Sequence, residues 1–280
     1  MPLLHAIVLG LVQGLAEFLP ISSSGHLLLV PWLFGWHDFD AVGRGPSVEK
    51  AFDVALHLGT LVAVVAYFRR ELVVLVRDGA SMVISRRRPT PPDGRLAWLL
   101  VLSAVPGALV GALFENVIDE RLGTPTIIGI SLIVFGVVLW WSDRRGGTRQ
   151  IGDYRVRDAL TVGAAQAIAL NPGTSRSGIT MTAARLLGFD RDTAARVSFL
   201  MAIPITGGAV AFKLAKLASD GIPDGLGVPM VVGILTSAVS GWFAVWGLLR
   251  LVRTRTFGAF VVYRVVAGVA VLALVASAVR

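Results

Sequence analysis

Long apolar stretches with few charges set the strongest limit on what this chain can fold into. A helix needs about 20 apolar residues to cross the hydrocarbon core of a bilayer. Four stretches meet this length: residues 96–115, 124–142, 228–250 and 259–279. Two others, 51–69 and 192–216, carry a few polar residues and are still predicted to span. Only 16% of the chain is charged, whereas soluble domains contain about 25% charged residues. The sequence therefore predicts an all-α integral membrane protein.

Two further apolar segments are interrupted by polar tips. Residues 3–34 are broken at Pro20 within PISSSG, and residues 157–187 are broken at Pro172 within NPGTSRSG. Proline and glycine end helices, and a serine or threonine directly after them is favoured as the N-cap of the next helix. Each resulting piece is too short to cross a bilayer alone. We expect two re-entrant helical hairpins, and a single kinked span is the alternative for each.

Sparse internal similarity relates the two halves of the chain. With an offset of 153, five residues of the first half fall on identical residues of the second: Gly10, Gln13, Ser22, Ser24 and Gly25 on Gly163, Gln166, Ser175, Ser177 and Gly178. Each half, about 1–142 and about 157–280 of a single membrane domain, is then a hairpin followed by three spans. Three spans reverse the chain and a hairpin does not, so the second half is predicted to be inverted. Inverted repeats place a shared site near the bilayer midplane.

The distribution of basic residues predicts the orientation. Lysine and arginine are enriched in cytoplasmic loops, and 18 of the 26 lie in four segments that this topology places on one side: 69–95, 143–158, 185–196 and 250–256. Six lie on the opposite side. We expect a multi-pass membrane protein with both termini outside and the first hairpin opening outward. The net charge of +8 reflects these loops and not nucleic-acid binding, and the N-terminus shows no cleavable signal peptide.

The hairpin tips carry the residues that could do chemistry. Gln13 and Glu17 are four apart and share one helix face, and Ser22 and Ser23 precede His26 by four and three residues. The second tip has its own candidates: Ser175, Arg176, Ser177 and Thr180. Ionisable groups inside a membrane segment are costly and indicate function. Two helix N-termini, near Ser22 and Thr174, and an arginine would together suit a phosphate.

Structural roles are the alternatives for these residues. The serines could be helix caps, Gln13 could bridge helices, Glu17 and Arg176 could form a structural ion pair, and His26 could be a packed histidine. Outside the tips, His57 is expected to have a structural or supporting role. Arg264 is expected to bind carbonyl groups or acids, or to extend toward the membrane surface.

The motifs GLVQGLAEFLPISSSGHLLL and NPGTSRSGIT resemble the two signature regions of the bacterial undecaprenyl-diphosphate phosphatase family associated with bacitracin resistance. AFDVALHLGTLVAVV, AARVSFLMAIP and FVVYRVVAG extend the resemblance over nearly the whole chain. The resemblance implies a membrane enzyme that hydrolyses the polyprenyl diphosphate to the monophosphate and thereby recycles the lipid carrier of cell-wall synthesis. It also implies a location in the bacterial cytoplasmic membrane, an outward-facing active site and a divalent cation, Mg²⁺ or Ca²⁺.

The resemblance also assigns roles to residues. The family's pair of acids corresponds to Gln13 and Glu17, and since many relatives have glutamate at the first position, Glu17 is expected to carry more of the metal-binding role. The family's serine and histidine correspond to Ser23 and His26. Its arginine motif corresponds to Ser175, Arg176, Ser177 and Thr180 of the second tip.

Three alternatives concern the function. The SSGH motif is similar to one box of the acid-phosphatase-like lipid phosphatases, but no histidine follows Ser175-Arg176 at the spacing that this class requires, so the class is rejected. A polyprenyl-phosphate flippase would use the same anion site without a nucleophile. Either Ser23 or His26 could be the nucleophile of a phosphatase, and the sequence leaves open the oligomeric state, a homodimer included.

Overall fold

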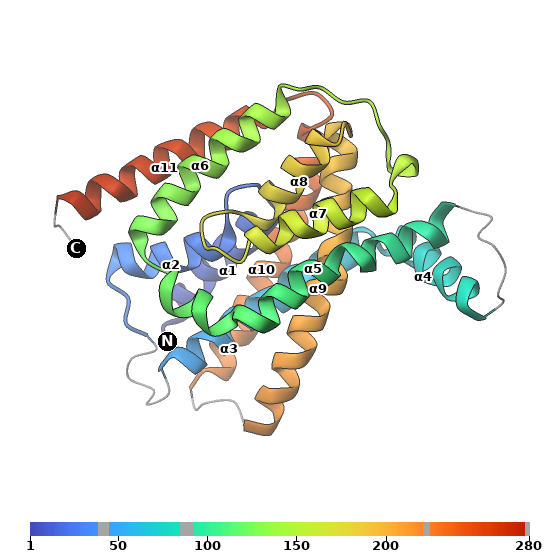
Figure 1. Ribbon diagram of the computed structural model, residues 1–280. Coiled ribbons are helices and arrows are strands. Elements are labelled where there is room, and N and C mark those ends of the chain that lie inside the picture. The colour runs from blue at the N-terminus through green and yellow to red at the C-terminus, as the bar shows by residue number, and fades with distance from the viewer. Residues whose placement is uncertain (39–44, 85–91, 221–224, 278–280) are drawn as a thin grey trace.

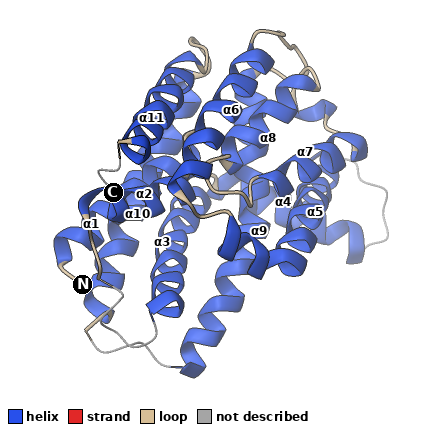
Figure 2. Cartoon of the chain, turned by 60° about the vertical axis from the view of Figure 1, so that its left-hand side comes forward, coloured by secondary structure: helices blue, strands red, loops and turns tan. Residues whose placement is uncertain are grey.

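The computed structural model describes residues 1–38, 45–84, 92–220 and 225–277, and these residues form a helical bundle (Figure 1). Their helices are α1 (Leu3–Phe18), α2 (Ser23–Phe34), α3 (Gly45–Tyr67), α4 (Arg69–Ile84), α5 (Pro92–Arg121), α6 (Pro125–Asp143), η2 (Ile151–Asp153), α7 (Val156–Ile168), α8 (Arg176–Leu186), α9 (Arg191–Asp220), α10 (Gly227–Leu251) and α11 (Gly258–Ala276). A view turned by 60° shows the same helical architecture, with loops at the connections between helices (Figure 2).

The long helices agree with the predicted spans. Among the described residues, five helices are long and apolar enough to cross a membrane by themselves: α5, α6, α9, α10 and α11. The sixth predicted span corresponds to α3. It meets the criterion together with α4, and the two helices are bent by 83° at Phe68. This architecture confirms the all-α membrane fold.

The first part of the predicted 69–95 loop is in fact the helix α4. It carries three arginines, Arg69, Arg70 and Arg77, and exposed apolar side chains that include Val73 and Val76. A helix with this composition is typical of one that lies along a membrane surface, which fits its sharp angle to α3. The hydropathy pattern did not reveal it because four of its residues, including Glu71, are charged within the first nine.

Both interrupted segments are two helices joined by a tip, as predicted. The chain breaks between α1 and α2 at Leu19–Ser22, and between α7 and α8 at Ala169–Ser175. Ser22 and Ser175 are the N-caps, and both have positive φ angles, 79° and 74°. Non-glycine residues in such conformations cost about 1–3 kcal/mol and cluster at functional sites. The internal similarity had aligned these two serines, so the tips share a backbone conformation as well as a sequence pattern.

The first hairpin is held against α10 by close backbone contact. Gly10 and Gly14 form a G-x-x-x-G pattern on α1. A Cβ atom at Gly14 would clash with the Ser240 hydroxyl and lie 2.5 Å from the Ser237 carbonyl oxygen. Small residues at membrane helix interfaces permit such an approach. The contact presents Gln13 and Glu17, on the same helix, toward the interior.

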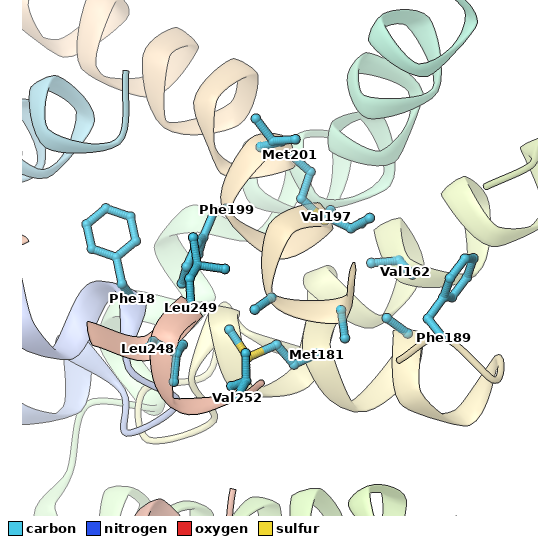
Figure 3. Close-up of a cluster of buried hydrophobic side chains, with 14 of the residues drawn as sticks. Phe18, Val162, Met181, Phe189, Val197, Phe199, Met201, Leu248, Leu249 and Val252 are labelled. Carbon is cyan, nitrogen blue, oxygen red and sulfur yellow. The ribbon is translucent and has the colours of Figure 1, made fainter. Parts of the chain in front are cut away.

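An apolar core anchors the two tips to the rest of the bundle (Figure 3). Phe18, at the end of α1, packs edge-on against Phe199 of α9 with ring centroids 5.3 Å apart. Met181 of α8 and Leu248 of α10 belong to the same buried cluster. Because the side chains come from both hairpins and from the long helices, the core positions the tips relative to each other.

Candidate active site

The two hairpin tips touch each other through hydrogen bonds between segments far apart in the sequence. The Ser22 hydroxyl oxygen accepts a hydrogen bond from the backbone N–H of Gly173 at 3.0 Å. In the other direction, the Ser177 hydroxyl donates to the Leu19 carbonyl oxygen, also at 3.0 Å. These two contacts join the first tip directly to the second.

Arg264 of α11 lies beneath this junction and joins both tips to α6. Its side chain is fully buried, and it donates to the carbonyl oxygens of Pro20 in the first tip (3.1 Å) and of Gly173 and Thr174 in the second (2.8 and 3.0 Å). Two further bonds reach the carbonyl oxygens of Ser131 and Leu132. Arg264 was expected to bind carbonyl groups or acids, or to extend toward the membrane surface. The structure shows that it binds carbonyl groups.

Glu17 is the centre of the site and receives hydrogen bonds from three side chains. Arg176 donates from Nη2 to Oε1 at 2.7 Å, across the junction. Ser23 donates its hydroxyl proton to Oε2 at 2.6 Å, and Gln13 donates from Nε2 to the same oxygen at 3.0 Å. The first half-helix thus supplies a buried carboxylate, the second an alcohol, and the other hairpin a cation.

The two histidines occupy different sides of this centre. Nε2 of His57 lies 3.7 Å from Oε2 of Glu17, while its Nδ1 donates to the Asp53 carbonyl oxygen at 2.7 Å. His57 therefore supports Glu17 from α3, in keeping with the supporting role expected for it.

His26 is turned toward α11. Its Nδ1 is 2.7 Å from the Ser22 carbonyl oxygen, which only accepts, so this nitrogen carries the proton. In a neutral ring Nε2 is then the acceptor, and the Tyr263 hydroxyl donates to it at 2.7 Å. His26 is therefore not a partner of the Glu17–Arg176 ion pair, because both of its ring nitrogens are bonded to other groups.

The remaining candidates of the second tip mainly shape the backbone. The Ser175 hydroxyl oxygen accepts from the Gly178 N–H at 3.1 Å and lies 3.2 Å from the Ser177 hydroxyl. Thr180 donates to the Arg176 carbonyl oxygen and contacts the Ser198 hydroxyl of α9 at 2.7 Å. α8 begins at Arg176, two residues after the predicted Thr174. The third N–H group of each helix is taken by its cap, that of Gly25 by Ser22 and that of Gly178 by Ser175. The first two N–H groups of α2 and α8 lie where a helix has no i−4 acceptor for them, and an anion can bind there.

Three polar atoms around Glu17 and the second tip make no hydrogen bond although they are buried. They are Nη1 of Arg176, Oε1 of Gln13 and Oδ1 of Asn171. A buried polar atom without a partner calls for an explanation such as a bound ion or ligand. The Arg176 atom is a donor suited to a phosphate oxygen, and the Gln13 atom is an oxygen ligand suited to Mg²⁺ or Ca²⁺.

Comparison with known proteins decides the family. The family model of bacitracin resistance protein BacA matches residues 6–270. The chain belongs to this family. Members named undecaprenyl-diphosphatase are similar to it over 98% of both chains: that of Pelobacter propionicus is 49% identical, that of Moorella thermoacetica 45% and that of Geobacter sulfurreducens 46%.

For this member of the BacA family, the tertiary structure adds one residue at the site that the sequence did not single out, Tyr263. Its only signal in the sequence was its place in FVVYRVVAG, next to Arg264. The hydrogen bond between Tyr263 and His26 joins residues 237 positions apart, so no local spacing could have revealed it.

Proposed function

We propose that this BacA-family protein is an undecaprenyl-diphosphate phosphatase that releases inorganic phosphate and leaves the polyprenyl monophosphate. The observation that carries the proposal is the set of short contacts to Glu17. A serine hydroxyl that donates to a carboxylate is an alcohol poised to lose its proton, and Arg176 beside it has a free donor for phosphate. The names of the full-length relatives support the same activity.

Binding the diphosphate would redistribute the partners of Glu17. Arg176 is held by one N–H on the carboxylate, with Nη1 unbonded. A phosphate bound at the N–H groups of the tips would present two oxygen atoms to the planar guanidinium group of Arg176, which can donate to both. As the arginine turns to the phosphate, the carboxylate is released from its cation and can accept the proton of Ser23.

Ser23 is the nucleophile that this geometry favours over His26. Its Oγ forms a bond to the terminal phosphorus while the bond from that phosphorus to the bridging oxygen breaks, and the polyprenyl monophosphate leaves. Glu17 takes the serine proton. Water then attacks the phosphoserine and frees inorganic phosphate; Ser23 regains a proton from the water, and Glu17 releases its own to solvent. His26 orients the tip through its bonds to the Ser22 carbonyl oxygen and to Tyr263.

The residues present fit a divalent cation that takes most of its ligands from the substrate and water. Gln13 Oε1 and the Glu17 carboxylate are the protein oxygens that would hold it. Mg²⁺ is usually bound through one or two carboxylates together with phosphate oxygens, which fits a site with one acid. When bound, such a cation would spread the charge of the transferring phosphoryl group.

The charge bias of the loops supports an outward-facing site, in the cytoplasmic membrane of a bacterium, with both termini outside. The second half would then be inverted relative to the first. The matching conformations of Ser22 and Ser175 support an internal repeat, and three spans between the two hairpins would make that repeat an inverted one.

The test is phosphate release from undecaprenyl diphosphate by the purified protein, with Mg²⁺ or Ca²⁺ and with a chelator. Ser23→Ala is expected to lower kcat by several orders of magnitude, since it removes the nucleophile, while a fluorescent polyprenyl diphosphate still binds. Glu17→Gln should lower kcat and also weaken the response to the cation. Wild-type protein that releases no phosphate would refute the phosphatase and favour a flippase, for which the Ser23–Glu17 contact provides no role.

A further inference from the structure

His57 of α3 faces the buried carboxylate of Glu17 without being hydrogen bonded to it. Its Nε2 atom lies 3.7 Å from Oε2 of Glu17, which is too far for a hydrogen bond. The carboxylate already accepts hydrogen bonds from Arg176, Ser23 and Gln13. It therefore does not need His57 as a fourth donor, and the position of the histidine calls for another explanation.

The proton of a neutral His57 ring lies on the nitrogen that faces away from Glu17. Nδ1 is 2.7 Å from the backbone carbonyl oxygen of Asp53, which only accepts, so Nδ1 is the donor. Nε2 is then left with a lone pair opposite the carboxylate oxygen, and a positive ion between the two atoms would satisfy both. Histidines that bind metal ions usually donate their other ring N–H to a carbonyl or carboxylate oxygen, which is the arrangement that His57 shows.

The separation of Nε2 and Oε2 suits two ligands of one ion. Ligand atoms at about 2.1 Å from a metal ion lie about 3.0 Å apart at a right angle and about 4.2 Å apart on opposite sides of it. The observed 3.7 Å lies between these limits. Arg176 donates to the other carboxylate oxygen, Oε1, so the arginine and the histidine act on different oxygens of Glu17.

A third protein ligand at this place would be a neutral group. In the part of the chain that the structure describes, no three histidines, cysteines or acids are grouped so that they could hold a metal ion. Glu17 and His57 therefore need a partner of another kind. Gln13 Oε1 is buried without a hydrogen bond, and Nε2 of the same amide donates to Oε2 of Glu17 at 3.0 Å, so this amide lies beside the carboxylate.

We propose that His57 is a ligand of the divalent cation at this site through Nε2, together with Glu17 and Gln13. The assignment rests on the proposed phosphatase function, since the diphosphate would supply further ligands. A nitrogen ligand changes which ion the site prefers, because Ca²⁺ takes oxygen ligands and imidazole suits transition metals. The site is therefore expected to bind a transition-metal ion such as Co²⁺ more tightly than Ca²⁺.

The first experiment detects the nitrogen ligand directly. Protein purified without a histidine tag is loaded with Mn²⁺ and with methylenediphosphonate, a diphosphate analogue that is not hydrolysed. Pulsed electron paramagnetic resonance then measures the coupling between the Mn²⁺ electron spin and a histidine nitrogen. The wild type should show this coupling, and His57→Gln should lose it. A wild-type spectrum without nitrogen coupling would overturn the proposal.

His26→Gln and His5→Gln are the matched controls, and both should keep the coupling. Both ring nitrogens of His26 are bonded to other groups, and His5 lies against Asp38 near the start of α1, whereas Glu17 is near its end. Coupling that disappears in either control and persists in His57→Gln would assign the nitrogen to another histidine and refute the proposal.

The second experiment measures the preference between ions. Isothermal titration calorimetry, with methylenediphosphonate present, gives the dissociation constants of Co²⁺ and Ca²⁺. His57→Gln is expected to weaken Co²⁺ binding at least about tenfold, because even a group that only supports a metal ligand contributes that much. The dissociation constant of Ca²⁺ should change by less than about threefold, since Ca²⁺ prefers the oxygen ligands that remain. Equal losses for the two ions would show that His57 has only a structural role.

Both experiments are independent of turnover, so they separate this proposal from the phosphatase function. A wild type that shows the nitrogen coupling but releases no phosphate would refute the phosphatase and leave His57 as a ligand. Phosphate release without the coupling would refute the ligand and leave the phosphatase. If His57→Gln fails to fold, coupling that survives in both controls supports His57, and coupling lost in either control refutes the assignment.

Discussion

Arg264 offers the sharpest test of how the two hairpin tips are held together. We expect Arg264→Met, which keeps a long side chain but removes every donor, to destabilise the protein and separate the tips. Arg264 donates to five carbonyl oxygens. Two of these, on Ser131 and Leu132, belong to α6 and keep their helical partners in the variant. The other three, on Pro20, Gly173 and Thr174, lie in the non-helical tips.

The expected magnitude follows from those three tip oxygens. A buried acceptor left without its partner costs about 1–3 kcal/mol, so the low end of that range for each gives a loss of about 3 kcal/mol or more. For a chain of this size, each kcal/mol lowers the unfolding midpoint by roughly 2–4 °C. The midpoint of Arg264→Met in detergent should therefore fall by about 6–12 °C.

Thermal unfolding by intrinsic tryptophan fluorescence measures this shift, and hydrogen exchange localises it. Faster exchange should appear at both tips, around Pro20 and Gly173, before it appears in α10. Arg255→Met is the control, because Arg255 is exposed and surface substitutions usually change stability by less than about 0.5 kcal/mol. An Arg264→Met midpoint equal to that of Arg255→Met, with unchanged exchange at the tips, would refute the reasoning.

Three other predictions follow. Arg176→Lys keeps the charge but loses the fork, so kcat/KM for undecaprenyl diphosphate should fall roughly 10- to 100-fold, as expected for one charged hydrogen bond of about 1.5–3 kcal/mol; wild-type turnover would make the ion pair purely structural. Gly14→Ala should lower the unfolding midpoint although alanine favours helices, because its Cβ would press on α10; a raised midpoint would show that α1 can shift away. In intact cells, an impermeant maleimide should label His37→Cys and not Gly152→Cys, and the reverse pattern would refute the proposed orientation.

Much of the architecture could be predicted because its causes are local in the sequence. Hydropathy and length predicted the spans, since a bilayer imposes the same minimum length on every helix that crosses it. The breaks at Pro20 and Pro172 predicted two-piece segments because proline ends helices through its own backbone geometry. The helix α4 was missed because its charges lower the mean hydropathy, although its exposed valines show that it has an apolar face.

The chemistry of the site was predicted as a set of residues but not as a set of bonds. Glu17, Ser23 and Arg176 were all singled out, and the sequence left open whether Ser23 or His26 is the nucleophile. In the structure Ser23 donates to Glu17, and His26 bonds to Ser22 and Tyr263. A spacing of three residues places two side chains near each other, but it does not decide which of several neighbours receives a proton.

Only the tertiary structure decided the contacts that join the halves of the chain. The ion pair between Arg176 and Glu17 spans 159 positions, and the bonds from Arg264 to the tips span between 90 and 244. Such contacts depend on how the helices pack, which is set by close approaches such as that of Gly14 to α10. The sequence alone therefore identified the membrane fold and the residues at the tips, because those follow from hydrophobicity and backbone geometry. The bonds that join one tip to the other and to α11 arose from packing between distant segments.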